Sequence, residues 1–344
     1  MSCCWSKKLF GGGRSKREDR YKVKEEEEVK NDGPAEAEAP KYSWDKRPKV
    51  DVSNFEIKEV HEKVVKKEGT DGGPMKIDNC TESTLLFLHS TSVVTIDDCR
   101  HCTIVLGPTE GSVFVRDCSN CTILTSCGQL RTRDCTSVRI GILCSTEPIV
   151  ESSNDISFYH LAMYYPELKD QMYSVGLRPF MNRATSAHDF TPAGVSGKGN
   201  FKVNASPVEL SERAFNLLTT KGVITAPNPN EFIPRISNIQ DSDPVYLFIL
   251  GKAEPANELG DKGIELLRAA YSADMKVMAT YDVITKNLDS KMIPFAGQAE
   301  RLILFKLSGT LEKLDCDVEF DLISENDSDA LQSLLVHLNT KNSG

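Results

Sequence analysis

A four-residue pattern ending in cysteine recurs as Ile77-Asp78-Asn79-Cys80, Ile96-Asp97-Asp98-Cys99, Val115-Arg116-Asp117-Cys118 and Thr132-Arg133-Asp134-Cys135. The cysteines lie 19, 19 and 17 residues apart, and a copy without cysteine, Val150-Glu151-Ser152-Ser153, follows 18 residues later. Short β-branched runs and turn residues fill the intervals. This period is typical of one coil of a parallel β-helix, whose coils must stack because one coil cannot bury its own apolar face.

The repeated cysteines are expected to form a ladder inside such a stack, where a small thiol packs as a hydrophobe. A second interpretation is open, because Cys99-x-x-Cys102 and Cys118-x-x-Cys121 also satisfy a zinc spacing. The other two repeated cysteines occupy the same register without a partner three residues later. We therefore favour the ladder over zinc and expect no metal site.

One arginine differs from the repeat around it. Position −4, counted back from each ladder residue, reads Lys76, Thr95, Phe114, Arg131 and Ile149. Arg133 belongs instead to the polar column at position −2, where it can pair with Glu151 of the next coil. Arg131 has no such structural explanation, and it follows Gly128-Gln129, where the backbone is free to approach another surface. Arg131 is therefore a candidate functional residue.

Residues from about 42 to 195 resemble the β-helical domain of the tubulin-folding cofactor C family. The resemblance is carried by Tyr42-Ser43-Trp44-Asp45, Leu106-Gly107-Pro108, Gln129-Leu130-Arg131, Glu147-Pro148-Ile149-Val150-Glu151, Tyr164-Tyr165-Pro166-Glu167-Leu168 and His188-Asp189-Phe190-Thr191-Pro192. The Gln-x-Arg triplet resembles the family's arginine-finger signature, which falls on Gln129 and Arg131. The chain departs from a related pattern at Gly128, where a second glutamine would stand.

The resemblance implies a GTPase-activating protein that lends Arg131 in trans to an Arf-like small GTPase, with tubulin as a second client. GTP hydrolysis builds negative charge around the γ-phosphate, which a planar, permanently charged guanidinium matches well. The residues implied to contact the partner's nucleotide are Gly111, Ser112, Gly128, Gln129, Leu130 and Arg131. Gln129 is assigned a catalytic role beside Arg131, Glu151 and Arg133 are supporting residues, and Phe190 is a partner contact. The chain needs no cofactor of its own, since the partner holds the GTP and its magnesium.

Two alternatives compete with this function. The chain is either an effector or adaptor that binds a GTP-loaded small GTPase with Arg131 only as a contact, or a cofactor C-like activator of tubulin. We find no P-loop, no defensible Ser-His-Asp order and no dinucleotide fingerprint, so the chain is not expected to be an enzyme by itself. The net charge of −9 argues against nucleic acid as a partner.

The first 41 residues have the composition of a disordered tail. Positions 1–24 contain eight Lys or Arg residues and two acidic residues, and an acidic run begins at Glu25. Cys3 and Cys4 precede the basic stretch, and an acylated cysteine with a polybasic segment provides the two signals of stable membrane attachment. Ser2 stands where a myristoylated glycine would be required. We expect palmitoylation, and placement at the cytoplasmic face of the plasma membrane, the ciliary base and the cytoplasm.

The predicted fold is mainly β in its first domain, a right-handed parallel β-helix, with a small α/β domain after it. The boundaries are a tail at 1–41, the β-helix at 42–200, a linker with a short helix around 208–218 at 201–242, and the α/β domain at 243–344. Strands are predicted at 245–250, 275–280 and 301–307, and helices at 261–273 and 328–338. The resemblance implies a nucleoside diphosphate kinase-like, ferredoxin-like fold for this domain. His337 lacks the Gly-Ser-Asp context of the kinase histidine, so we expect a catalytically inactive interaction module.

Overall fold

The structure is a computed structural model that describes residues 55–67, 69, 71–191, 199–225, 232–236, 244–251, 258–287 and 299–324. Several predictions from sequence lie outside these ranges: the tail with Cys3 and Cys4, the centre of the linker, and the closing helix with His337. Within the ranges, none of the helices has the length and apolar character needed to span a bilayer.

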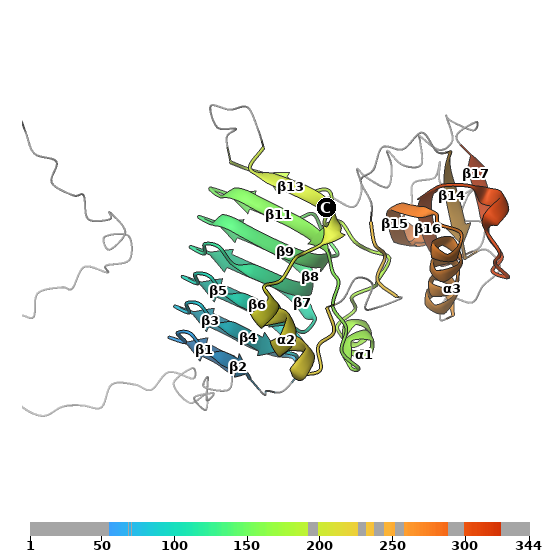
Figure 1. The fold of residues 1–344 in the computed structure, drawn as a ribbon. Helices are drawn as coiled ribbons and strands as arrows, with labels where there is room; N and C mark the ends of the chain where they lie inside the picture. Colours follow the sequence, from blue (N-terminus) through green and yellow to red (C-terminus); the bar gives the residue numbers. More distant parts are fainter. Residues whose placement is uncertain are drawn as a thin grey trace, which may run out of the picture. The chain divides into compact units, whose positions relative to one another are not determined.

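The first part of the described chain is a stack of parallel strands (Figure 1). These strands are β1 (Glu56–Lys58), β2 (Val64–Lys66), β3 (Gly73–Asp78), β4 (Thr84–Phe87), β5 (Thr91–Asp97), β6 (Thr103–Leu106), β7 (Thr109–Arg116), β8 (Thr122–Arg133), β9 (Thr136–Cys144), β10 (Ile149–Glu151), β11 (Asn154–His160), β12 (His188–Asp189) and β13 (Phe201–Pro207). Each pairs in parallel with the equivalent strand of the next coil, with the repeat in register: Asp97 faces Arg116, and Arg116 faces Arg133. The predicted parallel β-helix is confirmed.

Two faces of the coils carry the strand ladders. One face contains β1, β3, β5, β7, the second half of β8, β10 and β12. The other contains β2, β4, β6, the first half of β8, β9, β11 and β13. Single bridges between equivalent residues of successive coils, such as that between Arg100 and Ser119, form a third line. The stack continues beyond residue 200, because β13 pairs with β11 inside the segment predicted as a linker.

The cysteine ladder runs through the interior as the repeat predicts. No more than 1% of each residue is exposed in the set Cys80, Cys99, Cys118 and Cys135. Each thiol donates a hydrogen bond to the backbone carbonyl two residues before it. In the next coil Ser153 takes the same position, where its hydroxyl accepts from the Cys135 amide at 3.1 Å and donates to the Glu151 carbonyl at 2.8 Å.

The aspartate or asparagine before each ladder position is a corner residue. Asn79, Asp98, Asp117 and Asp134 have φ between 50° and 57°, in the left-handed region. Asn and Asp enter that region more readily than most residues with a side chain, because their short polar groups hydrogen-bond locally. The sequence showed the repeated residue type but not this reason for it.

A second buried ladder, which the sequence did not reveal, leads up to the candidate site. Its register partners in successive coils are Thr91, Thr109, Cys127 and Cys144. The two threonine hydroxyls are 2.9 Å apart, and the two sulfur atoms are 3.8 Å apart. Burial raises the pKa of the Cys127 thiol well above its ordinary value, so this thiol is protonated. Cys127 is fully buried, and it lies two residues before Gln129 on the same strand.

Two helices follow or interrupt the coils. Helix α1 (Leu168–Ser174) comes after β11, and α2 (Glu212–Thr220) comes after β13. The hydroxyl of Ser211 caps α2 by accepting a hydrogen bond from the Ala214 amide at 3.3 Å. The short helix predicted around 208–218 is therefore present, but its capping serine moves its start to residue 212.

The second part of the described chain is a small antiparallel sheet with one long helix. It contains β14 (Val245–Leu250), α3 (Leu259–Ser272), β15 (Lys276–Ile284), β16 (Arg301–Ser308) and β17 (Asp321–Ser324). The strand order is β15-β16-β14-β17, and every neighbouring pair is antiparallel. The predicted strands at 245–250, 275–280 and 301–307 and the predicted helix at 261–273 are confirmed within a few residues.

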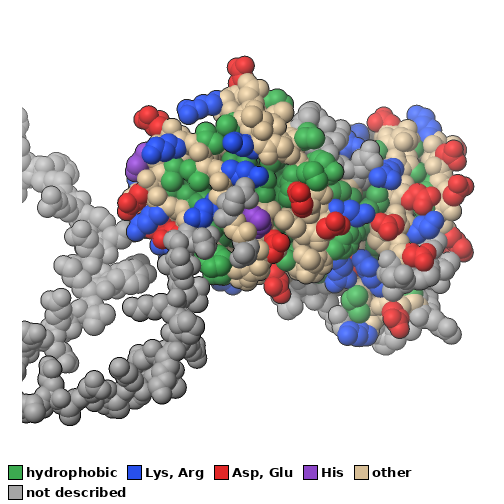
Figure 2. All heavy atoms as spheres, turned by 90° about the horizontal axis from the view of Figure 1, so that it is seen from below, with side chains coloured by type: hydrophobic (Ala, Val, Ile, Leu, Met, Phe, Trp, Pro, Cys, Tyr) green, Lys and Arg blue, Asp and Glu red, His purple; other side chains and the backbone are tan. Residues whose placement is uncertain are grey.

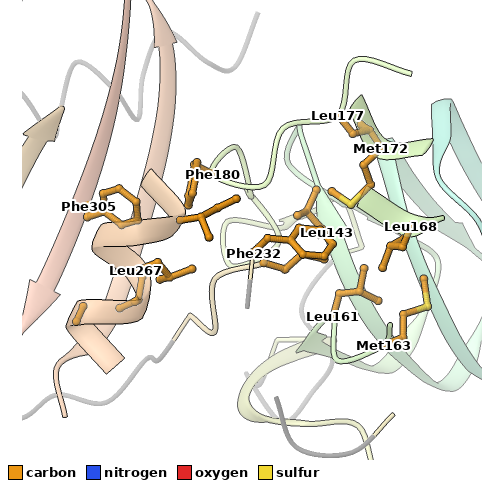
Figure 3. Close-up of a cluster of buried hydrophobic side chains, with 14 of the residues drawn as sticks. Leu143, Leu161, Met163, Leu168, Met172, Leu177, Phe180, Phe232, Leu267 and Phe305 are labelled. Carbon is orange, nitrogen blue, oxygen red and sulfur yellow. The ribbon is translucent and has the colours of Figure 1, made fainter. Parts of the chain in front are cut away.

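One buried hydrophobic cluster contains side chains from the coils and from the sheet with α3. Phe180, in the segment after α1, meets Phe305 of β16 with ring centroids 5.0 Å apart (Figure 3). Leu143 of β9 and Leu267 of α3 belong to the same cluster. Arg178 also forms an ion pair with Asp282, in which Nη1 of the arginine donates to Oδ1 of the aspartate at 3.0 Å. The segment 161–184 thus packs against the sheet as well as against the coils.

Candidate functional site

Arg131 lies on the outer side of β8. Leu130 and Thr132 on either side of it are fully buried, and Arg131 itself is exposed, as the alternation of side chains along a strand requires. Its register partners are Phe114 of β7 and Ile149 of β10, both half-buried. The side chain therefore projects into solvent from the middle of a regular sheet.

Gln129 holds the guanidinium at one atom. Arg131 donates from Nε to Gln129 Oε1 at 3.3 Å, and the same oxygen accepts from the Ser112 hydroxyl at 3.3 Å. Within the described ranges the side chain of Arg131 forms no ion pair within 4.0 Å and no second hydrogen bond. Its two terminal nitrogen groups are therefore available to a ligand, and its charge is not neutralised by a neighbour.

The neighbouring arginines on the same face are engaged with acids. Arg116 forms two hydrogen bonds to Asp97, at 2.7 and 2.8 Å. Arg133 lies 3.7 Å from the Asp134 carboxylate. The pair that we predicted between Arg133 and Glu151 does not form: the two residues face each other in register, but no ion pair joins them in the part of the chain that the structure describes.

The two glycines predicted to contact the nucleotide, Gly111 and Gly128, are required for a different reason. A Cβ atom at Gly128 would lie 2.4 Å from the Glu110 carbonyl oxygen, and one at Gly111 would lie 2.7 Å from the Ser92 carbonyl oxygen. The close approach that these glycines permit is therefore to the neighbouring coil. A glutamine at position 128 does not fit this backbone. Leu130 was also predicted to contact the nucleotide, but its side chain is fully buried and cannot make that contact.

Phe190 and His188 extend the site by one coil. His188 is the register partner of Ile149, and its ring centroid is 4.3 Å from that of Phe190. Phe190 is 62% exposed although its amide is bound to the Val150 carbonyl at 2.8 Å. An exposed phenylalanine on an anchored backbone is available to a protein partner, whereas a core role, the alternative to a contact, is excluded by its exposure.

The segment beyond Phe190 is held by one carboxylate. Asp189 accepts hydrogen bonds from the Thr191 amide at 2.8 Å and from the Asn200 side-chain amide at 2.9 Å. Partial burial raises the pKa of Asp189, but these hydrogen bonds to the charged form outweigh burial, so the net pKa is lowered. Asp189 is therefore ionised at neutral pH and ties the residues after β12 to those before β13.

The described surface around the first coils is mixed in charge. On the face shown in Figure 2, basic and acidic side chains are interspersed with apolar ones.

The site is thus a stack of parallel coils with an exposed arginine on its wall that has no counter-ion among the described residues. The sequence profile of the family described as "Tubulin binding cofactor C" matches residues 72–190, which include Gln129, Arg131 and Phe190.

Several curated proteins that are similar to this chain are named Protein XRP2. The chain is 44% identical to the one from Xenopus laevis over 192 residues, 55% of this chain and 53% of that one. It is 46% identical to the one from Homo sapiens over 171 residues, 49% of this chain and 48% of that one. The chain is thus a homologue of Protein XRP2 with a tubulin cofactor C-like domain, and it spans about half the length of these relatives.

A solved structure, the tubulin binding cofactor C from Leishmania major, aligns with 44% of this chain and 89% of its own length. Its sequence identity is 21% and its TM-score is 0.31, which is too low for this likeness to support an argument. Cys3 and Cys4 lie outside the described residues, so their acylation stays a prediction.

Proposed function

We propose that the chain is a GTPase-activating protein that supplies Arg131 in trans to an Arf-like small GTPase in its GTP state. One observation carries this proposal: Arg131 is exposed on a regular sheet, oriented by Gln129, and without a counter-ion among the described residues. An arginine with no structural role on its own protein is what a finger in trans requires, because it must give its charge to another active site.

The chain contributes to the reaction by electrostatic stabilisation. The partner holds GTP and its magnesium, and the transition state spreads negative charge over the γ-phosphate and the β–γ bridge. The terminal nitrogens of Arg131 donate to those oxygens while Gln129 holds Nε, so the fork is oriented before the partner arrives. A finger in trans is worth about 10³–10⁵ in rate, or about 4–7 kcal/mol.

Tubulin is the second candidate client. The family profile that matches residues 72–190 is described as tubulin binding, which favours including tubulin beside the small GTPase. A third candidate, an adaptor that recognises the GTP state without accelerating hydrolysis, uses the same surface, and Arg131 is then a binding contact only.

For the second domain we propose an interaction module of the ferredoxin-like, nucleoside diphosphate kinase-like type. The order β15-β16-β14-β17 with alternating antiparallel pairs supports this, because it is the order of a β-α-β-β-α-β fold. Helix α3 lies in the first crossover, and a single 3₁₀ turn (Leu311–Lys313) stands between β16 and β17 in place of a second helix. No phosphotransfer is proposed.

Single-turnover GTP hydrolysis tests the proposal, with an Arf-like GTPase and with tubulin as clients. We expect Arg131→Ala and Arg131→Lys to lose about 10³-fold or more of the stimulated rate, because neither keeps the charged fork. Binding of the GTP-loaded partner, measured separately, is expected to persist. Arg100→Ala, which removes an exposed arginine at the third line of the coils, is the matched control and should change neither quantity.

The alternatives give other results. An equal loss of binding and of rate in Arg131→Ala contradicts the finger and supports the adaptor. If only the GTP hydrolysis of tubulin is stimulated, then tubulin is the client and the proposed role of Arg131 is unchanged.

A further inference from the structure

The outward residues at the register position of Arg131 form a column across the coils, which we call the Arg131 column. In coil order it reads Glu56, Lys76, Thr95, Phe114, Arg131, Ile149 and His188. Its large apolar members are the two that flank the arginine. The neighbouring column, two residues further along each strand, reads Lys58, Asp78, Asp97, Arg116, Arg133 and Glu151 from β1 to β10, all of them charged, and Phe190 follows in the next coil.

Within the coils from β1 to β10, large apolar residues in these two columns are therefore confined to the two positions that flank Arg131. Neighbouring strands lie about 4.8 Å apart, so in-register side chains on one face stand beside each other. In the strand register Phe114 is the neighbour of Arg131 on one side and Ile149 on the other, and both are half-buried although they occupy outward positions. Gln129, two residues before Arg131 on the same strand, accepts a hydrogen bond from the same side chain.

We propose that Phe114 and Ile149 are positioning residues that keep Arg131 extended and exclude water from it when the partner docks. The inference rests on the proposed function and adds the residues through which the finger acts. An arginine loses much rotamer freedom when it is fixed, and a bracket that limits this freedom in the free protein lowers that loss on docking. Apolar neighbours also lower the local dielectric, which strengthens the attraction between guanidinium and phosphate.

Asp97, which stands opposite Arg116, shows what a different neighbour does. That acid fixes its arginine by two hydrogen bonds and neutralises it. An aromatic and an aliphatic neighbour can restrict a guanidinium without neutralising it. The bracket therefore solves a problem specific to a finger, which must be held and yet remain fully charged.

The kinetic test uses Phe114→Ser and Ile149→Ser in the full chain. We expect the stimulated kcat to fall about 10- to 100-fold for each, the scale of a misplaced catalytic group, with KM for the GTP-loaded partner changed far less. The conservative changes Phe114→Leu and Ile149→Val should retain the rate. Thr95→Ala, in the same column one coil from Phe114, is the matched control and should behave as the wild type. A rise in KM with kcat unchanged overturns the inference, because the two residues are then docking contacts only.

A second measurement needs no partner. We expect ¹⁵N relaxation of the Arg131 Nε–H group in the free protein to report a restricted side chain in the wild type and in Thr95→Ala, and a mobile one in the two serine variants. Equal mobility in all four proteins, with unchanged thermal unfolding, overturns the bracket. If the wild type stimulates no client, the proposed function fails, but this measurement still decides whether Phe114 and Ile149 hold the arginine.

Discussion

At the scale of single residues, one side chain type takes three different states on the same sheet face. Arg116 is fixed by Asp97, Arg133 lies near Asp134, and Arg131 is held through Nε by Gln129 and by no other side chain in the described part of the chain. Only the state of Arg116 is decided by an acid on the adjacent coil, because Asp134 follows Arg133 directly in the sequence and Gln129 lies on the same strand as Arg131.

Gly128 allows the first prediction at this scale. Its Cβ position lies 2.4 Å from the Glu110 carbonyl oxygen, so Gly128→Ala or Gly128→Gln forces the coils apart. We expect a loss of about 1–3 kcal/mol in the free energy of unfolding, measured by chemical denaturation. Gly199→Ala is the control, because the nearest atom to its Cβ position is 3.9 Å away. Unchanged stability in the Gly128 variants would show that the coils relax at no cost.

At the scale of elements, the hydrogen bonds of a single carboxylate fix the chain after β12. Asp189 precedes the exposed Phe190, and its bonds to Thr191 and Asn200 connect the end of β12 with the start of β13. The pKa of Asp189 is lowered from 3.8 by these bonds, which outweigh the opposing effect of burial. A carboxylate with a depressed folded pKa stabilises the fold above its unfolded pKa and ceases to do so as pH falls through the folded value.

Asp189→Asn should therefore be less stable than the wild type at pH 7, by about 1 kcal/mol, since water screens this partly exposed group. The difference should shrink as the pH falls below 3.8, the ordinary value from which the pKa is lowered. Denaturation curves of both proteins between pH 7 and pH 2 measure this. A difference that is the same at every pH would contradict the assignment of the effect to the ionised carboxylate.

At the scale of the whole molecule, one buried acid joins the β-sheet of the second part to the segment after α1. Asp282 has no exposed side-chain surface and accepts hydrogen bonds from Arg301 at 2.8 and 2.6 Å and from Arg178 at 3.0 Å. Removing one partner from a buried ion pair leaves charge without compensation.

We expect Asp282→Asn to lose about 3–5 kcal/mol of stability, because two arginines then lose the carboxylate that they share. Asp261→Asn is the matched control, since Lys169 and Asp261 form an exposed pair at 3.2 Å that is worth about 0–1 kcal/mol. Thermal and chemical unfolding measure both variants. Equal effects would mean that the Asp282 cluster contributes no more than a surface pair.

The sequence by itself determined the coil architecture and the candidate arginine. The repeat is visible because every coil must present equivalent residues to its neighbours, and Arg131 is visible because its column has no consistent residue type. The ladder position of Cys99 followed from the same periodicity. The left-handed corner at Asp98 did not, since residue type alone does not fix φ.

The tertiary structure decided how the site is built. The close approach of the backbone at Gly128 to Glu110, and the register that makes Phe114 and Ile149 the neighbours of Arg131, both depend on which residues the stacking brings together. The order of the four antiparallel strands likewise depends on contacts that form only in the folded protein. Local sequence fixes the period and direction of a strand, whereas its neighbours are fixed by contacts between residues far apart in the chain.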